Sequence, residues 1–370
     1  MRSPFALVAF VLVAACADNL TPRYFRPAQW PQADRAFRGD ARWLGGDGAY
    51  SIDLGGNRTL WLFGDSFISA LPEGTRARST LVRNSVAVME GRDPVTASVR
   101  FAPSFDARGV PRSYFYGEGD DETQAWYWPA HGARLPGGPL VLFLSRVVAA
   151  TGEGLGFVAN GWRVVVVSNP DDEPAEWRLQ WTRPPVVTFD AVPGAAVARE
   201  GGFLYAIAPR TRGQHDAYLA RFPEAEIARG DVLAQWWTSS GWVNQTNLVS
   251  GPPDVVLEEA GTECSLHRDT HLNRWVFVTS RGFGASAVAM RFAENLTGPW
   301  SDLLDVYTPP ESRAQNPFVY AAKAHPQLTT GDASELVITY ATNSFDPAVL
   351  LRPEGQALYW PRFVRVAMAR

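Results

Sequence analysis

The sequence predicts an all-β protein and, within that class, a five-bladed β-propeller. Short β-rich runs, separated by Gly, Pro, Asn and Asp clusters, recur along most of the 370 residues, and no long stretch shows helical periodicity. One type of hairpin also recurs about every 60 to 70 residues, a spacing typical of stacked blades. The rival architecture is a sandwich or jelly roll, but its strands should not repeat as five similar hairpins.

Each recurring unit is interpreted as the inner hairpin of one blade. The five hairpins pair residues 50–54 with 59–63, 132–135 with 140–144, 195–199 with 203–207, 264–268 with 275–279, and 326–328 with 336–340. An outer strand follows each hairpin, at residues 84–88, 162–167, 217–221, 285–291 and 364–368. Because the last outer strand ends the chain, ring closure needs a strand near the N-terminus, which we expect within residues 24–43.

The first sixteen residues have the pattern of an export signal. Arg2 gives a positive start, and residues 5–13 form an apolar run that is too short to span a bilayer. Ala14 and Ala15 precede Cys16, which resembles the lipobox of bacterial lipoproteins and predicts that Cys16 becomes the acylated first residue. The alternative is an ordinary secretory signal with an incidental cysteine. Both alternatives place the protein outside the cytoplasm, and we expect it in the bacterial cell envelope, at the outer membrane or in the periplasm.

The expected domain organisation follows from these segments. We predict a signal peptide at residues 1–16, a polar tether at 17–31 and one propeller domain at 32–370. Acylation of Cys16 would leave Cys264 as the only free thiol, so no intramolecular disulfide is expected.

The charge pattern argues against a nucleic-acid partner, because the net charge is −4 and the arginines are spread along the chain. Lys323 is the only lysine, which we interpret as composition bias. We expect a monomer that contacts the membrane through its lipid anchor.

The first hairpin carries two aspartates at one rim of the predicted propeller. Inner strands line a central channel, so the residues that precede the first strand and follow the second share a rim. With Gly56 at the centre of the hairpin, Asp47 and Asp65 are cross-strand neighbours, with Cα atoms roughly 4.5 to 5.5 Å apart. Two such carboxylates repel each other unless one holds a proton, so their pKa values should split. One group can then donate a proton while the other accepts one or positions water.

Both aspartates also have a structural alternative. Each is flanked by glycine, and a turn aspartate can use its carboxylate to accept hydrogen bonds from backbone N–H groups. For either residue alone this alternative is favoured, but the mirrored pair on one rim favours acid/base chemistry.

The opening of the predicted propeller resembles a known family. Residues 45–54, 59–67 and 84–86 look like the start of a five-bladed propeller family, long described as a domain of unknown function, that includes microbial endo-D-arabinanases. Weaker similarity extends to residues 128–132, 262–265, 298–300 and 325–326. The resemblance implies that Asp47 and Asp65 match the acidic pair that carries acid/base chemistry there, without fixing the substrate.

The same strand-end rule selects rim residues in the other blades. Glu263 is the third candidate catalytic carboxylate, because related propeller glycosidases use three acids from different blades; the alternative is a salt bridge between Glu263 and Arg281. The rule also selects His131, Arg146, Arg281, His325 and Asn343, and together with Asn84 and Trp128 these are the candidate substrate-binding residues. For His325, a structural hydrogen bond is an equal alternative.

Other motifs point to no further chemistry. The acidic run at residues 117–122 lacks the ordered alternation of an EF-hand loop, so no metal is assigned. The sequence has no Gly-x-Ser-x-Gly nucleophile elbow. We expect no cofactor.

These observations predict a glycoside hydrolase that acts on an extended extracytoplasmic polysaccharide. The resemblance favours arabinan-type furanosides, and we favour inversion of the anomeric centre. The alternative is a non-catalytic propeller lipoprotein that binds glycan or protein, because a fold does not fix a function. Unpaired carboxylates at an open cleft would favour the enzyme, whereas carboxylates held by arginine or backbone would favour the binder.

The lipid anchor gives the first testable prediction. Cys16→Ser removes the thiol that would be acylated, so the protein should move from the membrane fraction to the soluble extracytoplasmic fraction. Fractionation followed by immunoblotting measures this shift. Unchanged partition into the membrane would contradict the lipoprotein assignment.

Overall fold

The computed structural model describes residues 20–117, 121–152, 154–185, 189–248 and 251–369. The predicted signal peptide and Cys16 lie outside these residues. In the described part, regular structure is almost entirely β, with only two short α-helices, α1 (Glu224–Ile227) and α2 (Pro347–Leu350). Neither of these described helices has the length and apolar character needed to cross a membrane.

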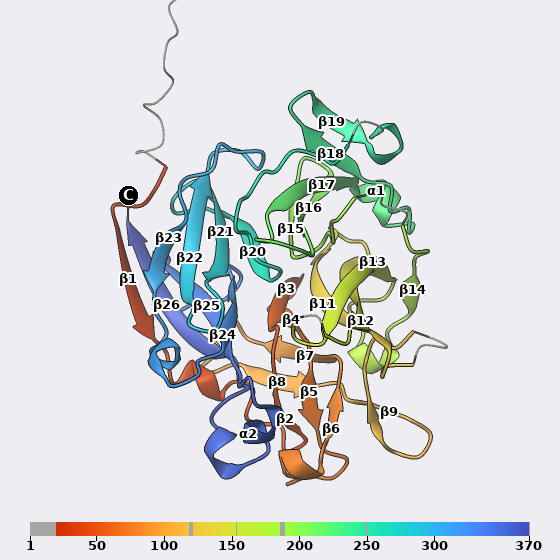
Figure 1. Cartoon of the computed structure of the whole chain (residues 1–370), viewed down its shortest axis with the longest axis vertical. Helices are drawn as coiled ribbons and strands as arrows, with labels where there is room; N and C mark the ends of the chain where they lie inside the picture. Colours follow the sequence, from red (N-terminus) through yellow and green to blue (C-terminus); the bar gives the residue numbers. More distant parts are fainter. Residues whose placement is uncertain (1–19, 118–120, 153, 186–188, 249–250, 370) are drawn as a thin grey trace, which may run out of the picture.

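Five antiparallel sheets are arranged around a central axis (Figure 1). The first is β3 (Tyr50–Gly55), β4 (Arg58–Phe63), β7 (Ser85–Glu90) and β8 (Ser98–Phe101); the second is β11 (Ala125–Arg134), β12 (Leu140–Ala149), β13 (Phe157–Val167) and β14 (Leu179–Trp181). The third is β15 (Ala196–Glu200), β16 (Phe203–Pro209), β17 (Ala217–Pro223), β18 (Gln235–Thr238) and β19 (Gly241–Asn244); the fourth is β20 (Cys264–Asp269), β21 (Arg274–Arg281), β22 (Ala287–Ala293) and β23 (Leu304–Tyr307).

The fifth sheet closes the ring with a strand from the other end of the chain. It consists of β24 (Val319–Ala324), β25 (Glu335–Thr342), β26 (Arg362–Ala369) and the N-terminal strand β1 (Tyr24–Gln29). β1 pairs with β26 from Tyr24 opposite Ala369 to Gln29 opposite Val364, and Figure 1 shows the two strands side by side. The chain is therefore a five-bladed β-propeller, as the sequence predicts. The closing strand lies in the expected region, but inside the segment predicted as a tether, so the propeller begins before residue 32.

The inner strand of the fifth blade differs from the prediction. The structure uses Val319–Ala324, whereas residues 326–328 follow this strand in a turn. The strand contains three alanines and one β-branched residue, which gives it a weak β-propensity. Ala321 also adopts a left-handed φ of 59°, and the pairing with β25 is interrupted there. A search based on β-propensity therefore overlooks this strand.

The hydrophobic core is divided among the gaps between neighbouring sheets. Each gap is filled by apolar side chains from the facing strands; between the second and third sheets, for example, Phe143 contacts Trp162 and Phe222. Similar clusters fill the other four gaps. Every blade is thus stabilised by apolar burial against both of its neighbours.

The common direction of the inner strands gives the propeller two different faces. β3 lies beside β11, β11 beside β15, β15 beside β20, and β20 beside β24. Asp47 precedes β3 and Asp65 follows β4, so these residues lie at one face, which we call the acid-pair face. The tight turns within the inner hairpins lie at the opposite face, which we call the hairpin-turn face.

Two small additional sheets extend the first blade. One contains β2 (Trp43–Gly46), β5 (Ser66–Ile68) and β6 (Thr80–Val82), and the other contains β9 (Ser104–Phe105) and β10 (Pro111–Arg112). The first of them continues directly from the two aspartates, because β2 ends just before Asp47 and β5 begins just after Asp65. It fixes the backbone on both sides of the pair.

Candidate active site

The backbone places Asp47 directly opposite Asp65. Gly46 is paired with Ser66 in the same register that joins β3 to β4, so the two aspartates are cross-strand neighbours, as expected. The Asp47 N–H donates to the Asp65 carbonyl (3.3 Å), and the Gly64 N–H donates to the Asp47 carbonyl (2.9 Å). Hydrogen bonds on both sides therefore hold the pair in position.

Glycines beside the two aspartates are required by close packing. A Cβ on Gly64 would lie 2.5 Å from Asp47 Oδ1, which is too close for any side chain. Gly48 has a φ of +81°, and a Cβ there would lie 3.0 Å from the Gly64 nitrogen. The Gly-Asp-Gly and Gly-Asp-Ser sequences thus allow the Asp47 carboxyl to lie against the neighbouring strand.

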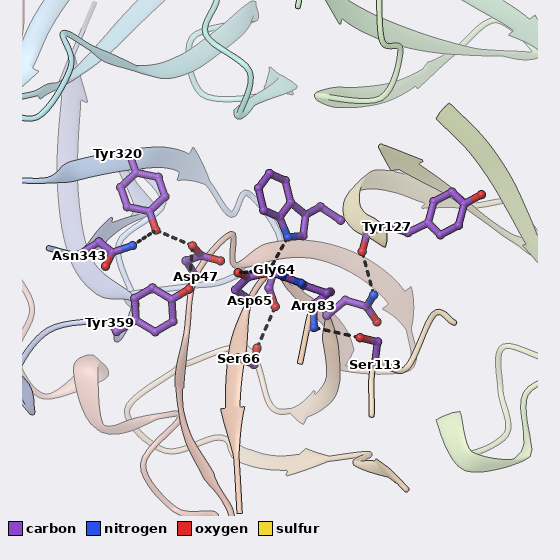
Figure 2. A network of polar contacts seen from close by, with 12 residues as sticks. Asp47, Gly64, Asp65, Ser66, Arg83, Ser113, Tyr127, Tyr320, Asn343 and Tyr359 are labelled. Carbon is purple, nitrogen blue, oxygen red and sulfur yellow. Dashed lines mark hydrogen bonds and ion pairs between the residues drawn. The ribbon is translucent and has the colours of Figure 1, made fainter. Parts of the chain in front are cut away.

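Two tyrosines hold the Asp47 carboxyl. The hydroxyls of Tyr320 and Tyr359 both donate to Asp47 Oδ2, the second at 3.2 Å. Figure 2 shows both rings pointing at this carboxyl. The Asn343 Nδ2 donates in turn to the Tyr320 hydroxyl (3.2 Å), which leaves that hydroxyl's proton for Asp47. Both donors thus converge on one oxygen of the Asp47 carboxyl.

The surroundings favour a protonated Asp47. Burial, followed by the negative charges of Asp65 and Glu263, raises the pKa of Asp47 from its ordinary 3.8 to about 8. The hydrogen bonds from Tyr320 and Tyr359 lower this pKa, but they do not offset the other effects. The carboxyl is therefore neutral at pH 7 and can donate a proton.

Asp65 has donors on both of its carboxylate oxygens. The Trp128 indole donates to Oδ1 at 2.7 Å, and Arg83 forms an ion pair with Oδ2 at 3.0 Å. Burial raises the pKa of Asp65, whereas Arg83 and Trp128 oppose that rise by stabilising the charged form. Of the two aspartates, Asp65 is the one with a cation bonded to it, so the proton of the pair resides on Asp47 and the negative charge on Asp65.

The contacts of the pair do not match those of ordinary turn residues. In the described part of the chain, the hydrogen bonds to both carboxyl groups come from tyrosine, tryptophan and arginine side chains instead of from backbone N–H groups. Both aspartates also keep part of their surface exposed, so a ligand can reach them. The alternative in which they cap turns is therefore not supported.

Glu263 is paired with a buried lysine. Lys323 is 1% exposed, and its Nζ donates to Glu263 Oε1 (2.9 Å), to the Gly48 carbonyl (2.5 Å) and to the Ala321 carbonyl (3.2 Å). The ammonium also lies 4.2 Å from the centre of the Tyr50 ring. Glu263 is close enough to raise the pKa of Asp47, but the salt bridge holds one of its oxygens. Although these acids gather at one rim, no group of three or more His, Cys, Asp or Glu side chains in the described residues is arranged to hold a metal ion.

The two predicted rim arginines lie apart from this network. Arg281 forms an ion pair with Asp305 at 3.3 Å, so the alternative salt bridge between Arg281 and Glu263 is wrong. Arg146 donates to the Asn160 side chain at 2.8 Å. Both arginines remain partly exposed, and their role in substrate binding stays a prediction.

The structure contradicts the expected substrate contact of Asn84. Its side chain is fully buried, with Nδ2 donating to the carbonyls of Phe115 (3.1 Å) and Tyr127 (2.9 Å). Its Oδ1 accepts from the Phe115 N–H at 2.7 Å. The amide is therefore used to join a loop to β11.

The two histidines among the predicted rim residues are both hydrogen-bonded within the protein. His325 is fully buried between the hydroxyls of Ser51 and Thr339, because the inner strand begins earlier than predicted and carries this residue below the rim. His131 Nδ1 accepts from the Val197 N–H (2.9 Å), so its Nε2 carries the proton and donates to the Ser51 carbonyl (3.0 Å). Burial lowers the pKa of both rings, to about 4 for His131. His325 is therefore not placed to contact a substrate, whereas His131 is partly exposed and its role in substrate binding stays a prediction.

Four residues of the network are not among those selected from the sequence. Tyr320 is the second residue of an inner strand, so the strand-end rule selects it once that strand is placed correctly. Lys323 is the only lysine in an arginine-rich chain, which is itself a signal. Arg83 directly precedes Asn84, but nothing in the sequence distinguishes Tyr359 from other tyrosines.

Comparison with known proteins supports the fold. A family model described as a domain of unknown function, DUF5005, matches residues 32–368. No curated protein sequence matches the chain. A solved structure from Bacteroides ovatus, described as a candidate hydrolase, is 17% identical and has a TM-score of 0.72, covering 98% of this chain and 97% of its own.

Two further solved structures are more distant. The GH43_1 enzyme from Xanthomonas citri is 11% identical with a TM-score of 0.47, and the alignment covers 92% of this chain and 93% of that one. The α-L-arabinofuranosidase from Lactobacillus brevis is 12% identical with a TM-score of 0.47, and the alignment covers 88% of this chain and 92% of that one.

The raised pKa of Asp47 predicts how stability depends on pH. Between pH 3.8 and about 8 the folded chain keeps a proton on Asp47 that the unfolded chain loses, so the contribution of this group falls as pH rises through that window. Asp47→Asn has no proton to lose, and its free energy of unfolding relative to the parent should therefore increase from pH 4 to pH 8.

Urea unfolding at several pH values measures this difference. Asp332→Asn is a control of opposite sign, because Ser334 donates to Asp332 and lowers its pKa. The stability that Asp332 contributes is lost as pH falls below 3.8, the ordinary pKa of aspartate. The free energy of unfolding of this variant should therefore differ from that of the parent by a constant amount from pH 5 to pH 8, and by less at pH 3. If the free energies of unfolding of Asp47→Asn and the parent differ by the same amount from pH 4 to pH 8, Asp47 is ionised in the folded protein.

Proposed function

This chain belongs to the family described as a domain of unknown function, DUF5005, and we propose that it is a glycoside hydrolase of the bacterial envelope that cleaves a polysaccharide by carboxylate acid/base catalysis. One observation carries the proposal: Asp47 and Asp65 face each other at one rim of the propeller, with surroundings that protonate the first and stabilise charge on the second. A protonated and an ionised carboxyl group are what glycoside hydrolysis requires.

Each aspartate has a definite role in the proposed reaction. Asp47 donates its proton to the glycosidic oxygen as the bond to the anomeric carbon breaks. Asp65 accepts a proton from a water molecule whose oxygen bonds to the same carbon. The product sugar gains the water hydroxyl, the leaving sugar gains the Asp47 proton, and Asp65 returns its proton to Asp47 through solvent.

We favour inversion of the anomeric centre, in which Asp65 acts as a base on water and the two carboxyl groups leave room for that water between them. Both oxygens of Asp65 accept hydrogen bonds, from Trp128 and Arg83, which hold the carboxylate in place. A carboxylate oxygen keeps a second lone pair when it accepts one hydrogen bond, so Asp65 can still accept a proton from water.

Glu263 acts on the reaction through Asp47. Its negative charge raises the pKa of Asp47, so it helps to keep the acid protonated at neutral pH. The salt bridge to Lys323 fixes Glu263 at 2.9 Å from the ammonium and keeps the carboxylate in one position. Tyr320 and Tyr359 are positioning residues that orient the Asp47 carboxyl.

Aromatic rings extend from the Asp65 side of the pair. Trp128, which donates to Asp65, contacts Trp126 at 5.8 Å and Phe157 at 4.7 Å between ring centres. Arg83 lies 4.1 Å from the centre of the Trp126 ring, which places this cluster beside the ion pair. Trp128 and Phe157 are partly exposed, so they can stack on a sugar next to the cleavage point.

A second aromatic cluster extends from the Asp47 side. Phe318 contacts Tyr320 at 4.8 Å and stacks on Phe345 at 4.3 Å, and Phe345 contacts Phe283 at 5.6 Å. Phe283 is 73% exposed and Phe345 is 45% exposed, so this is an exposed apolar patch. Rings on both sides of the acid pair favour an extended polymer lying across the rim over a single small sugar.

The kind of sugar and the place where the protein acts are proposed from the sequence. The opening motif's resemblance to the endo-D-arabinanase family supports an arabinan-type furanoside. The N-terminal segment supports action in the cell envelope, with the protein held by a lipid on Cys16.

A non-catalytic glycan-binding propeller is the second candidate function. The observation that favours it is the ion pair between Arg83 and Asp65, since a carboxylate held by arginine can be purely structural. The protonated Asp47 favours the enzyme, because a neutral carboxyl group contributes no ion pair to the fold.

The acid pair gives the prediction that tests the proposed function. Asp47→Asn and Asp65→Asn should each lose at least about a hundredfold in glycan cleavage, because general acid or base assistance contributes roughly 10² to 10⁴ in rate. Both variants should stay fully folded at the assay temperature, since side-chain volume is conserved. Initial rates on a panel of furanosidic and pyranosidic glycans, with thermal melts of the same preparations, measure both effects.

Asp53→Asn is the matched control in the same hairpin, because Asp53 is exposed and paired with Arg92 at the other end of the strand. It should cleave at the parental rate. If the parent cleaves no glycan in the panel but binds one, the non-catalytic candidate is favoured.

Glu263 gives a separate prediction about pH. Glu263→Gln removes a negative charge that raises the pKa of Asp47, so the loss of activity on the alkaline side should begin at a lower pH than in the parent. Initial rates from pH 5 to pH 10 measure how activity falls on the alkaline side. Glu335→Gln, in the fifth blade and paired with Arg365, is the control and should leave the profile unchanged. An unchanged pH profile of activity for Glu263→Gln would mean that deprotonation of Asp47 does not cause the loss of activity at high pH.

A further inference from the structure

A pocket lies between the third and fourth blades, away from the acid pair. Its volume is about 160 Å³, and its walls are Glu200, Tyr205, Trp242, Trp275 and the segment 294–297. Glu200 ends β15 and Trp275 is the second residue of β21, so both lie next to the tight turns of their inner hairpins. The pocket therefore opens at the hairpin-turn face, opposite the proposed catalytic face.

The wall of this pocket combines aromatic rings with polar groups. Tyr205 and Trp242 are partly exposed and meet edge to face, with ring centres 5.6 Å apart, while Trp275 is buried behind them. Within the described residues, the Glu200 carboxylate has no hydrogen bond or ion pair, although it lines the cavity. An unpaired acceptor beside aromatic rings suits a ligand that has both an apolar face and hydroxyl donors.

The charges around the pocket favour a neutral ligand. Glu200 and Glu294 would repel an anion, although Arg274 balances Glu294 at 3.3 Å. A cation is disfavoured for a different reason: the Arg221 guanidinium already lies 4.2 Å from the centre of the Trp242 ring. A second cation bound at that ring would be repelled by Arg221.

The size of the pocket suits one ring. A cavity of about 150 Å³ holds a molecule the size of benzene, so a pocket of 160 Å³ has room for one sugar ring. We propose that this pocket is a second, non-catalytic glycan-binding site that takes a single neutral sugar residue, stacked on Tyr205 and Trp242 and hydrogen-bonded to Glu200. This site is independent of the acid pair and would hold the protein on a polymer while the other face engages another segment.

The test measures the number of glycan-binding sites on the full chain. In an Asp47→Asn background, which prevents cleavage, titration calorimetry with neutral arabinan, xylan and galactan oligosaccharides should give two binding events per chain for at least one of them. Adding Trp242→Ala should weaken one event at least tenfold and leave the other unchanged. Glu200→Gln should also weaken it, by less, because the amide still offers one acceptor.

Trp181→Ala is the matched control, since Trp181 is likewise a partly exposed tryptophan in an outer strand of another blade. It should leave both events unchanged. The proposal is overturned if Trp242→Ala binds like this control, or if polygalacturonate or choline occupies the pocket more tightly than the neutral oligosaccharides. Failure of the proposed catalytic function gives a different result from failure of this proposal. The parent would then cleave no glycan, and the chain would show a single binding event, which Trp242→Ala abolishes.

Discussion

The pairing of Asp47 with Asp65 across one hairpin is the constraint on which the candidate site depends. Two hydrogen bonds hold the backbone of the pair, and Gly64 leaves space for the Asp47 carboxyl against the neighbouring strand. Two carboxylates this close cannot both be ionised at low cost, so the surrounding residues determine which one keeps the proton. Arg83 and Trp128 stabilise charge on one side, while on the other side burial and the repulsion from nearby carboxylates exceed the effect of the two tyrosine donors.

The propeller brings the groups around this pair together from distant parts of the sequence. Trp128 comes from the second blade, Glu263 from the start of the fourth, and Tyr320 from the fifth. Such a site depends on ring closure, because the fifth blade is completed by β1 from the N-terminal end of the chain. The same closure places His325 against Ser51, so a neutral histidine below the rim joins the first blade to the fifth.

The sequence could predict the repeating hairpins and the acid pair because both depend on local pattern and symmetry. It could not predict burial, which decides the roles of Asn84 and His325: an amide or imidazole at a strand end looks the same whether it faces solvent or joins two strands. The prediction misplaces the fifth inner strand because Val319–Ala324 has weak β-propensity, and it overlooks Tyr320 for the same reason. Tyr359 reaches the site through long-range packing that leaves no local signal.

Lys323 shows how a residue that resembles composition bias can have a physical reason to be present. Its ammonium has three N–H donors, and three acceptors surround it: two backbone carbonyls and the Glu263 carboxylate. A compact point charge fits this arrangement, whereas the planar guanidinium of arginine has five donors and needs more space. The chain otherwise uses arginine wherever it places a permanent positive charge, so the lysine is explained by the shape of this one position. Because this lysine holds the carboxylate that raises the pKa of Asp47, the geometry of a buried ammonium in the fifth blade helps to determine the protonation of an acid in the first.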